Sequence, residues 1–194
     1  MMYGTRERFD YTECGRCGCL QICNVPSCPE AYYPSDYYAH HLNVKLKDPG
    51  IVAFLKRQRT GASLGPRSIL NTVVGCFYRP PAYTDWLKTA KVGLDDPILD
   101  VGCGAGELLV RLSKDGFTNL TGIEPYISED VIYPNGIRIL RRSMDQIDEQ
   151  FSFVMLHHCF EHMADPLRAL CEVHRLLMPG KMALVRLPVA GSFA

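Results

Sequence analysis

A short apolar run, a glycine-rich turn and an amphipathic stretch follow one another directly between residues 98 and 114. Ile98–Val101 has the pattern of a buried strand, residues 102–106 read Gly-Cys-Gly-Ala-Gly, and Glu107–Lys114 has its leucines at helical spacing. A glycine-rich turn between a strand and a helix lets a ligand approach bare backbone at the helix N-terminus. The segment therefore predicts an α/β protein with a nucleotide-like cofactor at this turn.

Strand and helix patterns continue to alternate beyond this segment. Asp165 and Pro166 form a typical helix start, because Asp caps the N-terminus and Pro suits the first turn, and Pro179-Gly180 is expected to end that helix. The connection 125–136 is short, so any helix in it must also be short. The alternation predicts a Rossmann-like, doubly wound parallel sheet of about five strands. Besides 98–101, the strands are expected at 119–124, 137–140, 151–157 and 182–187.

The spacing of the glycines distinguishes between cofactors. A dinucleotide-binding turn would read G-x-G-x-x-G, whereas this turn reads G-x-G-x-G and is followed by Glu107. A pyrophosphate would meet that carboxylate at the helix N-terminus, which is electrostatically unfavourable. An NAD-dependent oxidoreductase is therefore the less favoured alternative.

Three features in order resemble class I S-adenosylmethionine-dependent methyltransferases. They are Asp-Val-Gly-Cys-Gly-Ala-Gly at 100–106, the acidic Glu124 at the end of the next strand, and His-Cys-Phe-Glu-His at 158–162. The resemblance covers roughly residues 98–187. It implies S-adenosylmethionine as the cofactor and methyl transfer as the reaction.

The resemblance also implies a role for each residue of the cofactor site. The three glycines of the turn would face the methionine part of the cofactor, and Asp100 would order the loop near its ammonium group. Glu124 would accept hydrogen bonds from both ribose hydroxyls. Ser143 and Met144, with Asp145 beside them, would lie along the adenine edge, where the family more often has Asp at the position of Ser143. The full set is Asp100, Gly102, Cys103, Gly104, Gly106, Glu124, Pro125, Ser143, Met144 and His157.

Two histidines at the end of the strand 151–157 are the candidate catalytic residues. Methyl transfer from a sulfonium is an in-line displacement on an activated donor, so the protein mainly aligns the reactants and only the acceptor needs a base. We expect His158 to be that base, with His157 second, because a histidine can take a proton near neutral pH. The alternative is that both only hydrogen-bond the loop. Glu161 and His162 are expected to brace the loop and the following helix.

Five of the nine cysteines fall within residues 14–28. Cys14-x-x-Cys17, followed by Tyr-Tyr-Pro-Ser-Asp-Tyr-Tyr at 32–38, resembles the N-terminal part of a bacterial methyltransferase subgroup with a zinc-ribbon-like module. This resemblance implies that Cys14 and Cys17 bind zinc. A complete ribbon needs a second pair roughly 15–20 residues away, and Cys23 and Cys28 have a looser spacing. The alternative is a half-lost ribbon with free thiols.

Charge divides the chain into three parts, although lysines and arginines equal the acidic residues at 21 each. A Cys/Tyr-rich segment at 1–44 has three basic and five acidic residues. A basic helical connector at 45–92 has nine basic and two acidic residues. The cofactor domain at 93–194 has nine basic and 14 acidic residues. In the connector, 51–59 and 69–77 predict two short helices with a solvated, partner-facing basic surface. We expect no nucleic-acid or membrane partner and a cytoplasmic protein, because no apolar run is long enough for a membrane span or a signal peptide.

The predicted strands end at residue 187 and seven residues follow. Methyltransferases of this class usually add two more strands, which form part of the acceptor wall, so we expect a chain incomplete at its C-terminus and clipped at its N-terminus. The exposed sheet edge would favour self-association. The predicted acceptor is a small molecule, sugar-like by association with the subgroup. The alternative is a non-catalytic cofactor-binding or assembly module.

Overall fold

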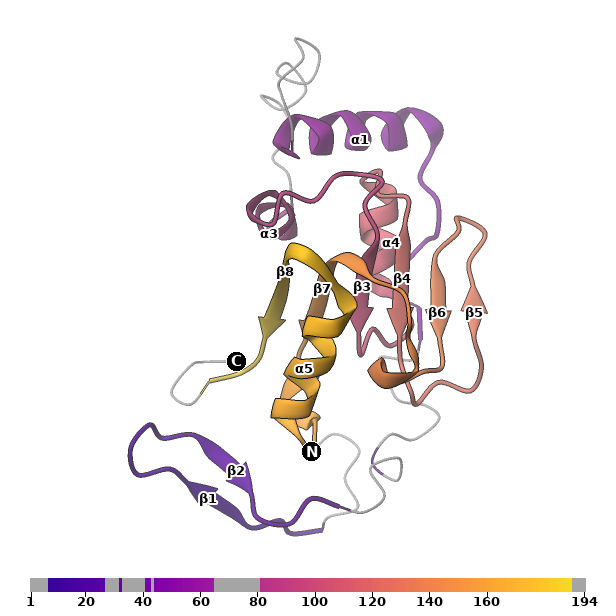
Figure 1. Cartoon of the computed structure of the whole chain (residues 1–194). Helices are drawn as coiled ribbons and strands as arrows, with labels where there is room; N and C mark the ends of the chain where they lie inside the picture. Colours follow the sequence, from indigo (N-terminus) through magenta and orange to yellow (C-terminus); the bar gives the residue numbers. More distant parts are fainter. Residues whose placement is uncertain (1–6, 27–31, 33–40, 43, 65–80, 190–194) are drawn as a thin grey trace.

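The computed structural model describes residues 7–26, 32, 41–42, 44–64 and 81–189. Its centre is a six-stranded sheet with the order β5-β6-β4-β3-β7-β8 (Figure 1). All neighbouring strands are parallel except β5 and β6, which form an antiparallel pair. The predicted Rossmann-like parallel sheet is therefore confirmed. The strands are β3 (Ile98–Val101), β4 (Leu120–Ile123), β5 (Val131–Ile132), β6 (Arg138–Leu140), β7 (Phe151–His157) and β8 (Leu177–Arg186).

Helices cover both faces of the sheet. Helices α3 (Tyr83–Thr89) and α4 (Glu107–Lys114) pack over one face, and α5 (Pro166–Leu176) packs over the other. Successive residues of a strand point to opposite faces, so β3 and β7 contribute to two separate cores. The first core contains Leu87, Ile98, Leu109, Phe153 and Met155, and the second contains Leu99, Val101, Val154, Leu156 and Val173.

The start of α5 follows the predicted capping pattern. The Asp165 side chain accepts a hydrogen bond from the Arg168 backbone N–H at 3.0 Å, and Pro166 occupies the first turn. Its end differs from the prediction, because the chain turns extended at Leu177 and pairs there with Phe151. Strand β8 therefore begins directly after the helix and contains Pro179-Gly180, where the pairing register with β7 shifts.

The connection between β4 and β6 was expected to hold at most a short helix. It instead contains β5, which pairs with β6 through a turn that includes Gly136 at φ 86°. A two-residue strand carries too few side chains to produce an alternating pattern, which is why the sequence did not reveal it.

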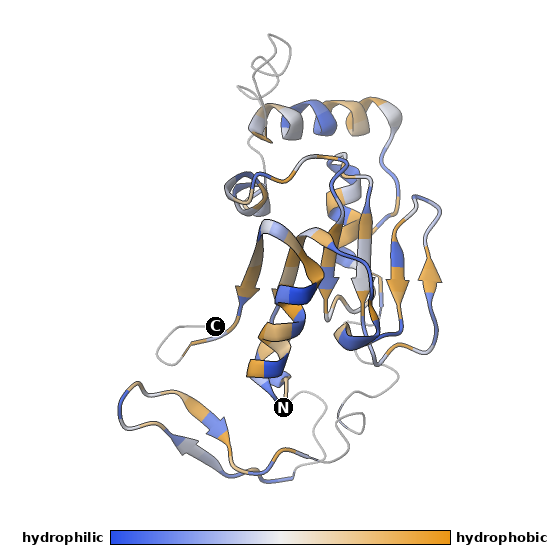
Figure 2. Ribbon diagram, in the orientation of Figure 1, coloured by the Kyte–Doolittle hydropathy of each residue, from blue (hydrophilic) through white to orange (hydrophobic). Residues whose placement is uncertain are grey.

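Helix α1 (Gly50–Leu64) turns two of its three basic residues toward the protein. Lys56 Nζ lies 2.5 Å from Asp48 Oδ2, and Arg59 Nη2 lies 2.7 Å from Asp115 Oδ1. The first turns of α1 are apolar (Figure 2), and their residues, among them Ile51 and Phe54, are exposed instead. The prediction of a solvated basic surface is therefore wrong for Lys56 and Arg59, because each forms an ion pair with a buried or half-buried carboxylate.

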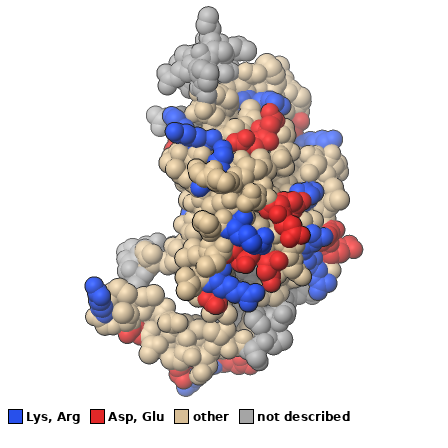
Figure 3. All heavy atoms as spheres, viewed as in Figure 1, with Lys and Arg blue, Asp and Glu red and all other residues tan. Residues whose placement is uncertain are grey.

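Two further expectations concern this connector. The glycine and proline break predicted at 61–66 does not stop α1, which continues to Leu64, and the second helix expected at 69–77 lies outside the described residues. On the face shown in Figure 3, basic and acidic side chains lie next to one another rather than in a field of one sign. Within the part of the chain that the structure describes, no helix has the length and apolar character needed to cross a membrane.

Candidate cofactor site at the carboxyl edge of the sheet

The glycine-rich loop 102–106 joins β3 to α4, and two of its glycines have no room for a side chain. Gly102 adopts φ 69°, and a Cβ on it would lie 2.6 Å from Cys159 Cβ. Gly106 adopts φ 77°, and a Cβ there would lie 2.6 Å from Ile139 Cδ1. Both the left-handed backbone and the close neighbours therefore require glycine.

Neighbouring elements hold this loop from two sides. The Gly102 and Cys103 backbone N–H groups both donate to the Ile123 carbonyl, at 2.8 and 3.2 Å. Cys159 Sγ donates to the Val101 carbonyl at 3.1 Å, so the segment after β7 is tied to the end of β3. The loop is thus preorganised rather than dependent on a ligand for its shape.

Tyr133, in the turn between β5 and β6, also holds the loop. Its hydroxyl donates to the Ala105 carbonyl at 2.8 Å. Sequence reasoning did not single out this residue, because its role depends on β5, which the sequence did not reveal. Burial raises the pKa of its phenol, with a smaller contribution from the Cys103 thiol, so the hydroxyl remains a donor at neutral pH.

Two buried carboxylates lie beneath the loop. Asp100 in β3 is 4% exposed, and Glu124, directly after β4, is 8% exposed. Glu124 accepts hydrogen bonds from the Gly104 N–H at 3.2 Å and from the Tyr126 N–H at 3.3 Å. Burial, and then the charge of Glu124, raises the pKa of Asp100 to about 7. The pair makes this edge of the sheet electronegative, so a cationic group bound here would stabilise both carboxylates.

Cys103 turns its side chain away from the open side of the loop. Its thiol is packed against Gly122 of β4 and donates a weak hydrogen bond to the Gly104 carbonyl at 3.4 Å. Burial, followed by the charges of Asp100 and Glu124, raises the pKa of this thiol well above its usual value. Cys103 therefore contributes backbone to the loop, and its thiol is not a nucleophile.

The two candidate catalytic histidines occupy different environments. His157 ends β7 with its ring 5.3 Å from the Trp86 ring, and burial lowers its pKa to about 4, with smaller effects from Arg186 and His158. The side chain of His158 is 58% exposed, and its Nδ1 lies 3.9 Å from Glu161 Oε1. This distance is within ion-pair range but too long for a hydrogen bond, so Glu161 lies near the more exposed of the two rings without fixing its orientation.

The backbone of His158 is strained. It adopts φ 53°, a left-handed conformation that is uncommon for residues other than glycine, while its N–H donates to the Arg186 carbonyl at 2.9 Å. Such strain costs about 1–3 kcal/mol and concentrates at functional sites. His162, in the short helix η4 (Phe160–His162), bonds back to the Cys159 carbonyl and so closes this turn.

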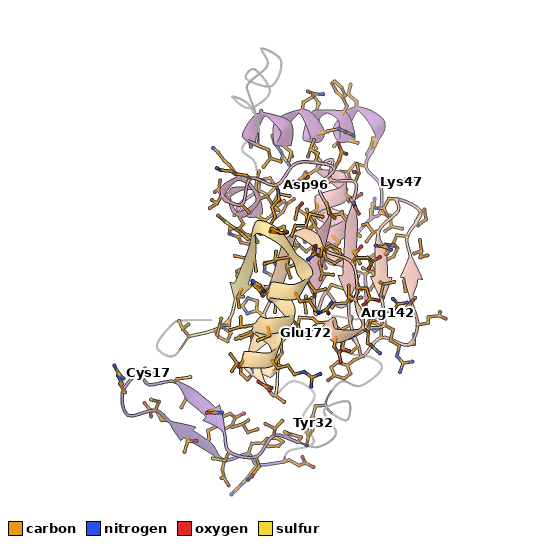
Figure 4. The ribbon with its side chains drawn as sticks, viewed as in Figure 1. Cys17, Tyr32, Lys47, Asp96, Arg142 and Glu172 are labelled. Carbon is orange, nitrogen blue, oxygen red and sulfur yellow. The ribbon has the colours of Figure 1, made fainter. Side chains whose placement is uncertain are left out.

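The residues expected along the adenine edge form a compact turn after β6. The Ser143 N–H donates to Gln146 Oε1 at 3.0 Å, and the Ser143 hydroxyl donates to Asp145. Arg175 of α5 donates to the Met144 carbonyl at 2.8 Å and so fixes the 3-10 turn η3 (Met144–Gln146). Pro125 follows Glu124 and is exposed. In Figure 4, Arg142 lies at this carboxyl edge, whereas Asp96, which precedes β3, lies at the opposite edge.

The cysteine-rich segment forms a separate hairpin. Strands β1 (Tyr11–Glu13) and β2 (Leu20–Ile22) pair antiparallel, and Figure 4 places Cys17 at the tip, away from the sheet. The backbone N–H groups of Arg16 and Cys17 lower the pKa of Cys14. Cys28 and residues 33–38 lie outside the described residues, and the described ones contain no group of three ligands that could hold a metal ion. The structure thus gives the zinc prediction no support.

A cofactor-binding α/β domain is the class that this parallel sheet, glycine loop and acidic edge define. The chain belongs to the family described as "Methyltransferase domain", whose model matches residues 38–193. Among similar proteins, EEF1A lysine methyltransferase 2 of Homo sapiens is 49% identical over 39 residues, which are 20% of this chain and 16% of that protein. Uncharacterized methyltransferase Rv3342 of Mycobacterium tuberculosis is 28% identical over 127 residues, 56% of this chain and 47% of that protein. The chain thus spans less than half of either relative.

Solved structures with a similar arrangement include the plantazolicin methyltransferase BpumL, in complex with a monoazolic desmethylPZN analog and SAH. The identity is 21% and the TM-score is 0.44, over 69% of this chain and 46% of that chain. A second complex of the same enzyme, with a pentazolic analog, has a TM-score of 0.43 at 21% identity, over 70% of this chain and 60% of that chain.

Proposed function

We propose that this chain binds S-adenosylmethionine and transfers its methyl group to a small-molecule acceptor. The observation that carries the proposal is the buried pair Asp100 and Glu124 beneath a preorganised glycine loop. S-adenosylmethionine brings a sulfonium and an ammonium group, and both suit an electronegative site. A dinucleotide would instead place a pyrophosphate near these carboxylates and Glu107, so membership of the methyltransferase family and the charge of the site favour the same cofactor.

The proposed contacts follow the loop from the methionine end of the cofactor to the adenine end. The backbone of Gly102, Gly104 and Gly106 faces the methionine part, and Asp100 lies near its ammonium group. Each oxygen of Glu124 accepts one backbone hydrogen bond, which leaves further lone pairs for the ribose hydroxyls. Ser143 and Met144 line the adenine, next to Pro125. The cofactor therefore runs along the carboxyl edge from β3 toward β6.

The proposed reaction is an in-line displacement at the methyl carbon. The acceptor's lone pair forms the new bond to carbon, the carbon–sulfur bond breaks, and its electron pair neutralises the sulfonium to give S-adenosylhomocysteine. His158, held near Glu161, takes the acceptor's proton. His157 is the weaker candidate at neutral pH, because its pKa is about 4 and Arg186 faces its Nδ1.

The proposed acceptor is a small molecule, and a sugar-like one is the more specific hypothesis. A sugar-like acceptor rests on the resemblance of the N-terminal segment to one subgroup. The similar proteins include a lysine methyltransferase and a methyltransferase solved with a desmethylPZN analog, and neither supports a sugar acceptor. The second candidate function is a cofactor-binding module without activity, and it stands because the chain spans less than half of the relatives named above.

Calorimetry with S-adenosylhomocysteine tests the cofactor site. We expect binding by the whole chain and roughly 10- to 100-fold weaker binding by Glu124→Gln, because hydrogen bonds to a charged acceptor contribute about 1.5–3 kcal/mol. Glutamine keeps one side-chain oxygen, which can still accept from the Gly104 N–H, but it loses the acceptor for the Tyr126 N–H. Glu149→Gln is the matched control, since Glu149 is exposed and, among the described residues, pairs only with Arg138. No binding at millimolar ligand contradicts the proposal, as does equal affinity in both variants.

A further inference from the structure

Three side chains from separate elements meet beyond the carboxyl end of β7. Trp86 comes from α3, His157 ends β7 and Arg186 ends β8, directly opposite His157 in the strand register. His157 and Arg186 both contact Trp86 of α3 and so lie on the face of the sheet that α3 covers, and alternation along β3 places Asp100 on the same face as Ile98. We name these residues the Trp86–His157–Arg186 cluster.

Arg186 supplies a positive charge that has no acidic partner among the residues that the structure describes. Its Cζ lies 4.8 Å from the centroid of the Trp86 ring, and its Nη1 lies 3.5 Å from His157 Nδ1. None of the ion pairs recorded for the described residues includes Arg186, whereas Arg59, Arg138 and Arg175 each pair with a carboxylate. Stacking on an aromatic ring fixes the plane of a guanidinium and leaves its edge N–H groups available to a planar anion.

His157 contributes a neutral ring with a buried N–H donor to the cluster. A guanidinium only donates, so His157 Nδ1 must accept and its proton is on Nε2. That Nε2–H is buried, and it has no acceptor among the described residues. Since its pKa is about 4, the ring is neutral and Arg186 carries the only charge of the cluster. The groups that face the ring are Arg186 from β8, His158 from its own segment and the uncharged Trp86 from α3.

We propose that the Trp86–His157–Arg186 cluster recognises an anionic group, a carboxylate or a phosphate, on the methyl acceptor. This rests on the proposed function, which places the cofactor over β3, β4 and β6. The strand order puts β7 and β8 on the other side of β3, so a group bound by Arg186 lies beside the methyl donor rather than beside the ribose. Carboxylate and phosphate share the fork geometry that a guanidinium binds with two hydrogen bonds.

The test uses the fluorescence of Trp86, the one tryptophan of the chain. Acetate and inorganic phosphate are titrated into the full chain at constant ionic strength, with chloride as the replaced anion, in the absence and presence of S-adenosylhomocysteine. We expect a saturable change with acetate or phosphate, and the more effective anion identifies the acceptor's group. Arg186→Gln should weaken this response at least tenfold. Arg186→Lys should weaken it less, because it keeps the charge but loses the planar fork.

Arg8→Gln is the matched control, because it removes one exposed positive charge from the N-terminal segment, and its response should equal that of the unmodified chain. The absence of a saturable change in a chain that binds S-adenosylhomocysteine overturns the inference and leaves the proposed function standing. Competition between the anion and S-adenosylhomocysteine would assign the cluster to the cofactor's own carboxylate and overturn the acceptor role. Failure of S-adenosylhomocysteine to bind at all removes the proposed function, and the acceptor role with it.

Discussion

Gly122 of β4 has no room for a side chain, and both the packing of the sheet and the position of the cofactor loop depend on this. A Cβ on this residue would overlap Cys103 Sγ and lie 2.9 Å from both Ile139 Cδ1 and Leu109 Cδ1. Carbon atoms in contact are normally about 3.5–4.0 Å apart. Gly122→Ala therefore requires Cys103, and the loop that carries it, to move.

The expected cost follows from overpacking. Extra methyl groups in a packed core cost about 1–3 kcal/mol, whereas the lower entropy of alanine in the unfolded chain returns about 0.4–1 kcal/mol. We expect Gly122→Ala to reduce the free energy of unfolding by about 1–2 kcal/mol. Because Cys103 belongs to the loop, the same substitution should weaken binding of S-adenosylhomocysteine.

A double-mutant cycle identifies Cys103 as the cause. Cys103→Ala alone removes one buried sulfur and should cost about 1 kcal/mol, comparable to losing a buried methyl group. In the double variant the new methyl group fills the space of the sulfur, so we expect a favourable coupling of about 1 kcal/mol in urea unfolding. Gly15→Ala, where nothing lies within 4 Å of the new Cβ, is the control. Additive effects in the cycle, or an unchanged Gly122→Ala, would refute this reasoning.

Two further predictions concern buried carboxylates. Asp115→Asn should destabilise the chain by about 3 kcal/mol in urea unfolding, because it leaves the half-buried Arg59 without a counter-charge, whereas the exposed Glu149→Gln should cost under about 1 kcal/mol. Asp100 keeps in the folded state a proton that the unfolded chain releases near its ordinary pKa of 3.8, so its contribution to stability falls between about pH 4 and pH 7. Asp100→Asn should therefore stabilise the chain more at pH 8 than at pH 5, and an equal effect at both values would contradict the raised pKa of Asp100.

The sequence predicted most accurately those elements whose bounds depend on residues close together in the chain. The pattern of Ile98–Val101, the glycine loop and Glu107–Lys114 placed β3 and α4 at their observed bounds, because burial on both faces produces a continuous apolar run. Strand β7 was found at 151–157 for the same reason. The start of α5 was found through Asp165, whose capping contact spans only three residues.

Contacts between distant segments were beyond the reach of the sequence. Tyr133 reaches the loop only because β5 pairs with β6, and Trp86 reaches His157 only because α3 packs over the sheet. The direction of the basic residues of α1 depends on Asp48 and on Asp115, which lies 56 residues from Arg59. No periodicity within a segment encodes such partners.

One alternation along the strands determines both the core and the site. The face of β3 and β7 that buries Ile98, Phe153 and Met155 under α3 and α4 also carries Asp100 and His157, which are two residues further along. Because the period is two, a one-residue slip in register would move the apolar residues and the functional side chains to the wrong face together. The apolar residues that specify the register therefore also place the carboxylate beside the loop and the histidine beside Arg186. This explains why the parts of the site that lie on β3 and β7 need no register signal of their own.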